Sequence, residues 1–487
     1  MNTHWLRNGL MLACLAGTPL ATLNAFAAEP QSAPAPTPAQ AAPPEGDETL
    51  RPLSTAPSRT PGEHQLLVML RLPATHFRPD ASYGGRYIDD SGRGSRRRRA
   101  EELARQHGLT LVDDWPMPVL GLDCYVMRYP DNDNAERIIA KLARDPQVEW
   151  AQPVASFEGM ATPPARAAAD SPQPPGSDAL YPVQPAARYW HVAELHRQTT
   201  GRDIKIAVID SGIDGSHPDL LGQLAVNTNF VDNAAPPPEN HGTAVAGIIA
   251  ARAGHGGIVG VAPQARLMGL RACWQQPDLA TRCNSFTLSK ALNYAILNGA
   301  QVINLSLAGP PDRLLDKLLD VALERGIGVV GAVDAKAAGP AFPASHRGVL
   351  AVASQPSAGR LAAAPAVAAA ASSTHSAALT AAPPTAAVPS GDPPLLAPGN
   401  DIPTTAPGGR WSFVSGSSYA AAHVSGMLAL MAQLQPGATP AQLRRLLQPG
   451  DTLNTVNIDA CATISRLLRN CSCSCTAAGL TQRGVGP

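Results

Sequence analysis

From about residue 179 onward, short apolar runs alternate with segments of helical periodicity. The run at residues 204–209, Ile-Lys-Ile-Ala-Val-Ile, is almost continuously apolar, as in a strand covered on both faces of a parallel sheet. Further strands are expected at 267–270, 302–305, 328–331 and 349–352, and helices at 243–251, 287–297 and 314–324. The alternation predicts an α/β fold with a doubly wound, mostly parallel sheet, whose ligands bind beyond the carboxyl ends of the strands.

A smaller unit is expected before this region, over residues 63–160. Its apolar patterns follow the order β-α-β-β-α-β, with strands at 65–71, 109–115, 122–129 and 148–157 and helices at 97–107 and 134–143. Asn134 stands where an N-cap would start the second helix. This order is typical of a ferredoxin-like α+β domain.

Three stretches lack apolar periodicity and are rich in proline and alanine: residues 29–62, 161–178 and 355–395. Such composition cannot bury a core, so we expect the first two to be linkers and the third to be a surface insertion. With these boundaries the α/β domain covers residues 179–450, and a cysteine-rich tail covers 451–487.

The first 28 residues have the pattern of a secretory signal. Arg7 supplies a positive flank, an apolar run follows at 10–16, and Ala25-Phe26-Ala27 offers a small-x-small cleavage site. No later run reaches the about 20 apolar residues that a membrane span needs. The sequence therefore predicts an exported protein without a transmembrane segment, located in the medium, in the periplasm or at the cell surface.

The charges of the chain balance. It has 38 Lys and Arg residues against 38 Asp and Glu residues, so its formal net charge is zero. This balance argues against nucleic acid or an anionic membrane as the main partner.

The cysteines favour disulfide bonds. Of the eight, Cys14 lies in the signal and Cys124 stands alone, which leaves an even number in an exported chain. We expect Cys273 and Cys283 to bridge one loop. The Cys-Ser-Cys-Ser-Cys cluster at 471–475 could bind a metal instead, but no histidine or carboxylate nearby completes a site. No metal site is predicted.

Three residues that could act together stand in separate local motifs. Ser418 lies at the start of an Ala-rich helix, where free backbone N–H groups suit an oxyanion, although a serine there is far more often only a helix cap. Asp210 follows the strand at 204–209 and could hold an imidazole or cap a turn. His241 precedes Gly242 at a helix start, where a lone histidine is usually a turn residue. Together they offer a nucleophile, a base and an orienting acid.

In the order Asp, His, Ser, these motifs resemble the subtilisin-like serine proteases over about residues 179–450. The matching blocks are Asp210-Ser211-Gly212, His241-Gly242-Thr243, Ser306-Leu307-Ala308-Gly309 and Gly416-Ser417-Ser418-Tyr419-Ala420, with Gly260-Val261-Ala262-Pro263 and Ala397-Pro398-Gly399 in support. The resemblance implies a serine endopeptidase that hydrolyses peptide bonds through an acyl-enzyme.

The resemblance gives each of these residues a role. Ser418 would be the nucleophile, His241 the base that takes its proton and returns it to the leaving amine, and Asp210 the acid that fixes the histidine tautomer. Histidine suits this task because a free imidazole titrates near pH ~6.5. Peptide or protein substrates would pair by their backbone with one wall of an extended cleft. That wall would consist of Ser306, Leu307, Ala308 and Gly309.

The resemblance also extends to the region before the α/β domain. Residues 63–160 are similar to the family's propeptide, a chaperone and inhibitor that is removed on maturation. The protein would then be an exported, autoprocessed preproenzyme with its own propeptide as a partner. Calcium is common in the family, but no ligand block can be carried over, so calcium rests on the resemblance alone and no cofactor is identified from the residues.

One position departs from the family pattern. The family presents an Asn side chain to the oxyanion, and here Asp334, or Ala335 across a one-residue gap, takes that place. An ionised Asp would repel the oxyanion. Losing one donor typically costs about 10²- to 10³-fold in turnover, and the backbone N–H of Ser418 would remain. The alternative function is therefore a catalytically weak or inactive scaffold that binds peptides in the cleft.

Overall fold

The computed structural model describes residues 64–72, 90–167, 178–232, 234–337, 341–355, 393–447 and 456–469. The predicted signal at 1–28, the linker at 29–62, nearly all of the insertion at 355–395 and the cysteine cluster at 471–475 lie outside these ranges. None of the described helices is long and apolar enough to cross a membrane.

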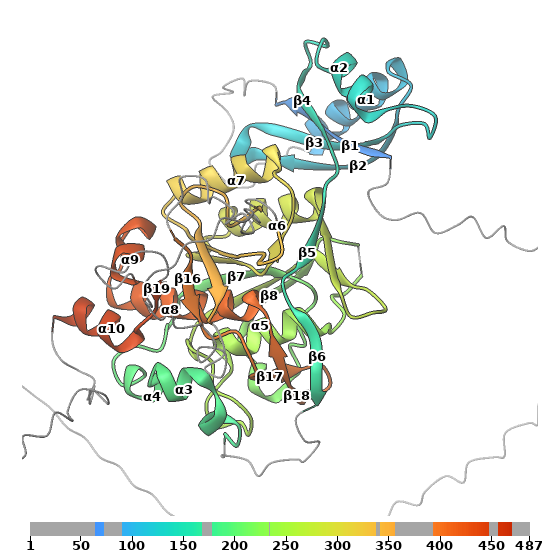
Figure 1. Cartoon of the computed structure of the whole chain (residues 1–487). Coiled ribbons are helices and arrows are strands. Elements are labelled where there is room, and N and C mark those ends of the chain that lie inside the picture. Colours follow the sequence, from blue (N-terminus) through green and yellow to red (C-terminus); the bar gives the residue numbers. More distant parts are fainter. Residues whose placement is uncertain are drawn as a thin grey trace, which may run out of the picture. The chain divides into compact units, whose positions relative to one another are not determined.

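Eight parallel strands form the main sheet (Figure 1). They are β7 (Lys205–Asp210), β8 (Leu224–Asn229), β9 (Arg266–Arg271), β12 (Val302–Leu305), β14 (Gly328–Ala332), β15 (Leu350–Ser354), β16 (Leu395–Ala397) and β19 (Val456–Asn457). Their order is β19-β16-β15-β14-β12-β7-β9-β8, so the chain reverses its direction of travel across the sheet beside β7. The predicted doubly wound α/β fold is confirmed.

Helices cover both faces of this sheet because its strands are apolar on both sides. In β7, Ile206 and Val208 lie in one core with residues of α5 and α8, whereas Ala207 and Ile209 lie in another with residues of α6 and α7. Figure 1 shows the two helix pairs on opposite sides of the sheet. The four helices are α5 (Asn240–Ala250), α6 (Ser285–Leu297), α7 (Arg313–Glu324) and α8 (Ser417–Leu434).

Shorter elements complete the region. They are η2 (Tyr181–Val183), α3 (Pro185–Tyr189), α4 (Val192–Leu195), η3 (Pro218–Leu220), β10 (Cys273–Gln275), β11 (Thr281–Asn284), β13 (Leu307–Ala308), β17 (Ile402–Ala406), β18 (Arg410–Ser415), α9 (Pro440–Leu447) and α10 (Ala460–Leu468). The predicted disulfide between Cys273 and Cys283 is confirmed, and it joins β10 to β11.

The cysteine-rich tail expected at 451–487 differs from the structure at its start. Here β19 extends the main sheet beside β16, and Ile458 and Ile464 are buried in the same core as α8. The α/β domain thus continues past residue 450. A two-residue edge strand and a nine-residue helix carry too few apolar positions to be separated from a tail by periodicity. Cys461 of α10 is disulfide-bonded.

The N-terminal unit has the expected ferredoxin-like order. Its four antiparallel strands lie in the order β2-β3-β1-β4. Leu66 and Val68 face a core with residues of its two helices, whereas Leu67 and Met69 join the core that contains residues of α6 and α7. The elements are β1 (Gln65–Arg71), α1 (Asp90–Gln106), β2 (Thr110–Met117), η1 (Pro118–Leu120), β3 (Leu122–Arg128), α2 (Ala135–Leu142) and β4 (Val148–Pro153).

The last strand predicted for this unit, at 148–157, is two strands. After β4, the chain forms β5 (Ser156–Gly159), which pairs with β11 and β13 of the α/β domain. A further strand, β6 (Thr162–Ala167), pairs with β18 inside the stretch expected to be a linker at 161–178. Both strands are held by backbone pairing with strands of the α/β domain, which requires no apolar pattern, and the sequence therefore did not reveal them.

His423 provides a test of the core that lies under α8. Its ring is buried edge-on against Trp190, and its Nδ1 lies 2.7 Å from the carbonyl oxygen of Tyr419. Burial lowers the pKa of His423 to about 4, although the bond to Tyr419 opposes this change. In an unfolded chain a histidine titrates near ~6.5. The neutral ring therefore stabilises the fold fully above pH ~6.5, and this contribution is lost as pH falls toward about 4.

Between about pH 7 and about pH 5, we expect the free energy of unfolding to fall by about 2 kcal/mol more in the parent than in His423→Asn. Asn keeps an N–H donor for the Tyr419 carbonyl group but does not titrate. Both proteins would carry Ser418→Ala, and urea unfolding at the two pH values gives the free energies. An equal decrease in the free energy of unfolding of the two proteins would contradict the assignment of this pH dependence to His423.

Candidate active site

Asp210 and His241 form a buried pair. Asp210 is the last residue of β7 and His241 lies in the first turn of α5, so the topology brings strand end and helix start together. Nδ1 of His241 lies 2.7 Å from Oδ1 of Asp210, and the exposed fractions of the two side chains are only 6% and 2%. The N–H of Ser211 donates to the same Oδ1 at 2.7 Å. Nε2 of His241 is buried and has no hydrogen-bond partner in the part of the chain that the structure describes.

Ser418 lies in the first turn of α8 and is fully buried. Its Oγ donates to the carbonyl oxygen of Ser306 at 2.9 Å. Its backbone N–H, one of the free donors at a helix start, donates to the carbonyl oxygen of Met160 at 3.1 Å. The peptide group between Met160 and Ala161 therefore rests on the N-terminus of α8.

Gly416 makes this approach possible. A Cβ atom at this position would lie 2.3 Å from the Met160 carbonyl oxygen and 2.7 Å from Cα of Ala161. Gly416 also has φ 147°, a conformation that residues with a side chain rarely adopt. The glycine that precedes the serine pair thus lets the backbone at 160–161 lie against the start of α8.

The predicted substrate wall binds a segment of the chain itself. Leu307 and Ala308 pair antiparallel with Gly159 and Glu158 of β5, and the N–H of Met160 donates to the Ser306 carbonyl group at 3.3 Å. Oγ of Ser306 donates to the carbonyl oxygen of Ser418 at 2.9 Å. Gly309 instead forms an isolated antiparallel β-bridge with Phe342. The segment at 156–160 therefore lies between β11 and β13 as an added strand.

Among the described residues, no hydrogen bond joins Asp334 to the Met160 carbonyl group. Its Oδ1 accepts from the backbone N–H of Lys336 at 2.8 Å, and the preceding Val333 accepts from Oγ of Ser417 at 2.6 Å. Among the described residues, Met160 O receives its hydrogen bond from Ser418 N. The oxyanion role of the Asp334 side chain therefore stays a prediction.

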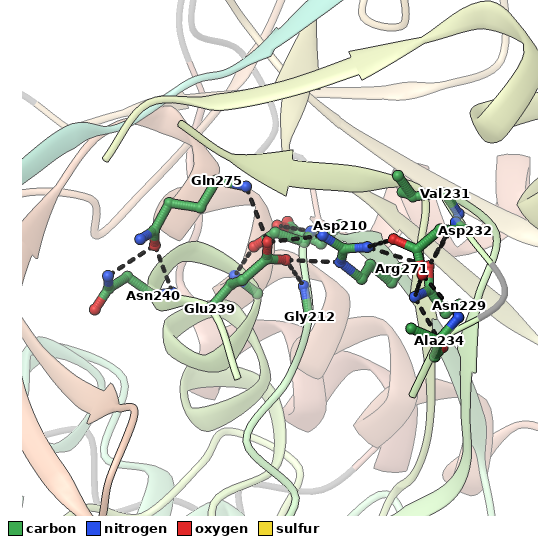
Figure 2. A network of polar contacts seen from close by, with 12 residues as sticks. Asp210, Gly212, Asn229, Val231, Asp232, Ala234, Glu239, Asn240, Arg271 and Gln275 are labelled. Atoms are coloured by element: carbon green, nitrogen blue, oxygen red, sulfur yellow. Dashed lines mark hydrogen bonds and ion pairs between the residues drawn. The ribbon is translucent and has the colours of Figure 1, made fainter. Parts of the chain in front are cut away.

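A second, ionic network holds the segments that carry Asp210 and His241 (Figure 2). Arg271 at the end of β9 donates through Nε and Nη2 to the two carboxylate oxygens of Glu239, each at 3.0 Å. Glu239 accepts from the backbone N–H of Gly212 and from that of Gln275, and the Gln275 side chain accepts from the N–H of Asn240 at 3.0 Å. One carboxylate therefore ties the turn after Asp210 to the start of α5.

Arg271 continues the network outward to Asn229 and Asp232, at 3.2 and 3.1 Å from Nη1. Burial acts to lower the pKa of Arg271, but its hydrogen bonds to the negatively charged Glu239 and Asp232 raise the pKa overall, so the cation is retained. Sequence reasoning missed this pair. The available signal was an arginine at the carboxyl end of a buried strand and a glutamate two residues before His241, since such buried charges must be paired.

Within the described ranges, no group of three or more His, Cys, Asp or Glu side chains is placed to hold a metal ion.

The chain is similar to known proteins in sequence and in fold. A model of the subtilase family matches residues 201–455. The thermophilic serine proteinase of Bacillus sp. (strain AK1) is 32% identical over 343 residues, which covers 66% of this chain and 74% of that protein. Thermitase of Thermoactinomyces vulgaris is 34% identical over 174 residues, covering 35% of this chain and 59% of thermitase.

Among solved structures, fervidolysin from Fervidobacterium pennivorans, described as a keratinolytic enzyme related to subtilisin, is similar in fold. The TM-score is 0.57 at 21% identity, and the match covers 82% of this chain and 61% of the fervidolysin chain. Matched over more than half of its length by the family model and by the thermophilic proteinase, the chain belongs to the subtilase family, the subtilisin-like serine endopeptidases.

Proposed function

We propose that Ser418, His241 and Asp210 form the catalytic triad of this endopeptidase, and that the first bond it cleaves is its own Met160–Ala161 peptide bond. The observation that carries the proposal is the hydrogen bond from Ser418 N to Met160 O, because an N–H in that place can stabilise an oxyanion on the same atom.

The reaction consumes one water per peptide bond. Oγ of Ser418 attacks the carbonyl carbon of Met160 while its proton passes to Nε2 of His241. The tetrahedral intermediate collapses, the bond to the nitrogen of Ala161 breaks, and His241 returns the proton to that nitrogen. Water then attacks the acyl-enzyme, again giving a proton to His241, and the carboxylate of Met160 and the hydroxyl of Ser418 are released.

Asp210 keeps the imidazole ready for this step. A proton on Nδ1 donates to Oδ1 of Asp210, so Nε2 carries the free lone pair that a base needs. The burial of Nε2 of His241, without a hydrogen-bond partner among the described residues, supports this assignment. Oγ of Ser418 donates to the Ser306 carbonyl group in this structure, and the proposed proton transfer requires it to turn toward Nε2 of His241.

We infer that residues 63–160 are a propeptide and that residues 156–160 inhibit the enzyme until cleavage is complete. In support, β5 fills the cleft as a strand between β11 and β13, the place where a peptide substrate would pair. Cleavage after Met160 would leave the ferredoxin-like unit as a separate chain. The α/β domain would then begin at Ala161.

Export is part of the proposal. The signal pattern at 1–28 supports it, as does the disulfide between Cys273 and Cys283, since such bonds persist in oxidising compartments. The mature enzyme would act on peptides or proteins outside the cytoplasm.

A fluorophosphonate probe tests the proposed nucleophile. We expect the mature protein to be labelled on Ser418, located by peptide mass spectrometry, and we expect labelling to stop in His241→Ala, because the hydroxyl then has no base. Folded mature protein that takes no label would overturn the assignment and favour a peptide-binding scaffold.

A further inference from the structure

The strand β11 places two side chains against the chain's own segment in the cleft. Arg282 stands opposite Glu158, and Thr281 precedes it beside Gly159. The disulfide at Cys283 ties β11 to β10, so this wall is braced from behind. The neighbours of positions 158 and 159 therefore indicate which substrate residues this enzyme accepts.

Position 159 is tight for a side chain. A Cβ atom there would lie 3.0 Å from Cβ of Thr281 and 3.4 Å from Nε2 of His241. Neither neighbour can easily move, because the imidazole is held by Asp210 and Thr281 is buried in a cross-linked hairpin. A Cβ atom on the substrate residue at this position would crowd Thr281 and would touch the catalytic base at the limit of ordinary van der Waals contact.

The side chain at position 158 is recognised through its charge. The guanidinium group of Arg282 forms an ion pair with the carboxylate of Glu158. The two side chains are 41% and 56% exposed, so water and salt weaken the attraction. The expected selectivity at this position is therefore small beside the steric selectivity at position 159.

We propose that Thr281 and Arg282 determine the cleavage specificity, selecting substrates with glycine just before the residue whose carbonyl group is attacked and a carboxylate one residue earlier. The motif is Glu-Gly-X or Asp-Gly-X, with cleavage after X. The inference rests on the proposed function, because it assumes that the cleft now holding Glu158 and Gly159 also holds substrates.

Quenched fluorescent peptides test the preference. The reference has the chain's own sequence from Phe157 to Thr162, Phe-Glu-Gly-Met-Ala-Thr. With the mature enzyme, replacing its glycine by alanine should lower kcat/KM by about 10- to 100-fold, as expected for one carbon in a tight site. Replacing its glutamate by glutamine should lower it about two- to fivefold. Equal rates for the three peptides would overturn the proposal.

Two variants assign the steric effect to one atom. Thr281→Gly removes the Cβ atom and should bring the rates for the glycine and alanine peptides to within about threefold. Thr281→Ser is the matched control, since it keeps Cβ and should keep the full preference. If Thr281→Gly retains the preference, Thr281 is not its source.

A third variant tests the charge. Arg282→Glu should reverse the preference at the earlier position, so that a peptide with lysine in place of glutamate is cleaved faster than the reference. A variant that still favours glutamate would exclude Arg282 as the determinant.

The same samples separate this inference from the proposed function. For each protein, one aliquot is treated with the fluorophosphonate probe and a second, untreated aliquot is assayed on casein. No labelling and no casein hydrolysis in the wild type counts against the triad. An enzyme that takes the label in one aliquot and hydrolyses casein in the untreated one, but shows no preference among the peptides, counts against the specificity alone.

Discussion

A Ser418→Ala variant is expected to remain an uncleaved precursor and to hydrolyse peptides about 10⁶-fold more slowly than the mature enzyme. The variant keeps the backbone N–H that contacts Met160 O, so the oxyanion donor stays in place while the nucleophile is lost. Intact-mass analysis after expression gives the length of the chain, and a peptide assay gives the rate.

Ser417→Ala is the matched control for this change. Ser417 immediately precedes Ser418, but its hydroxyl bonds the Val333 carbonyl group and has no part in the triad. We expect this variant to process itself. A Ser418→Ala protein that matures as fast as Ser417→Ala would show that another protease, or another residue, cleaves the chain.

An Asp210→Asn variant is expected to lose about 10⁴-fold in kcat, with a much smaller change in KM. An amide can turn its NH₂ group toward Nδ1 of His241, which favours the tautomer with the proton on Nε2. That nitrogen then cannot accept the proton of Ser418. The half-time of self-cleavage should lengthen by a similar factor, because the same base serves both reactions.

Asp232→Asn is the control for the loss of a carboxylate near this site. Asp232 is about half exposed and contacts Arg271, not His241. We expect less than about a tenfold change in kcat from it, in line with a weak exposed ion pair. If Asp210→Asn lowers kcat no further than Asp232→Asn does, the orienting role of Asp210 is wrong.

Side-chain periodicity predicted the parts of the fold that bury apolar side chains. The strand at 302–305 is observed at those bounds, and the helix expected at 314–324 begins one residue earlier, at Arg313. The strands β5 and β6 could not be predicted in their observed partnerships. They are fixed by backbone hydrogen bonds to β11, β13 and β18, and such bonds leave no mark on the sequence.

The same distinction applies to the site. Asp210 and His241 could be anticipated because a strand end and a helix start impose a local pattern. The structure places Oδ1 of Asp210 2.7 Å from Nδ1 of His241. The hydrogen bond from Ser418 N to Met160 O could not be anticipated, because every residue has a carbonyl oxygen. Asp334 was considered from its place after β14, yet its side chain closes its own turn on Lys336.

The N-terminal residue of the matured wild-type protein tests the central claim most directly. Sequencing should read Ala-Thr-Pro-Pro, beginning at Ala161, because the carbonyl group held by Ser418 N is that of Met160. Active enzyme whose N-terminus arises from another bond, with the Met160–Ala161 bond still intact, would contradict the account.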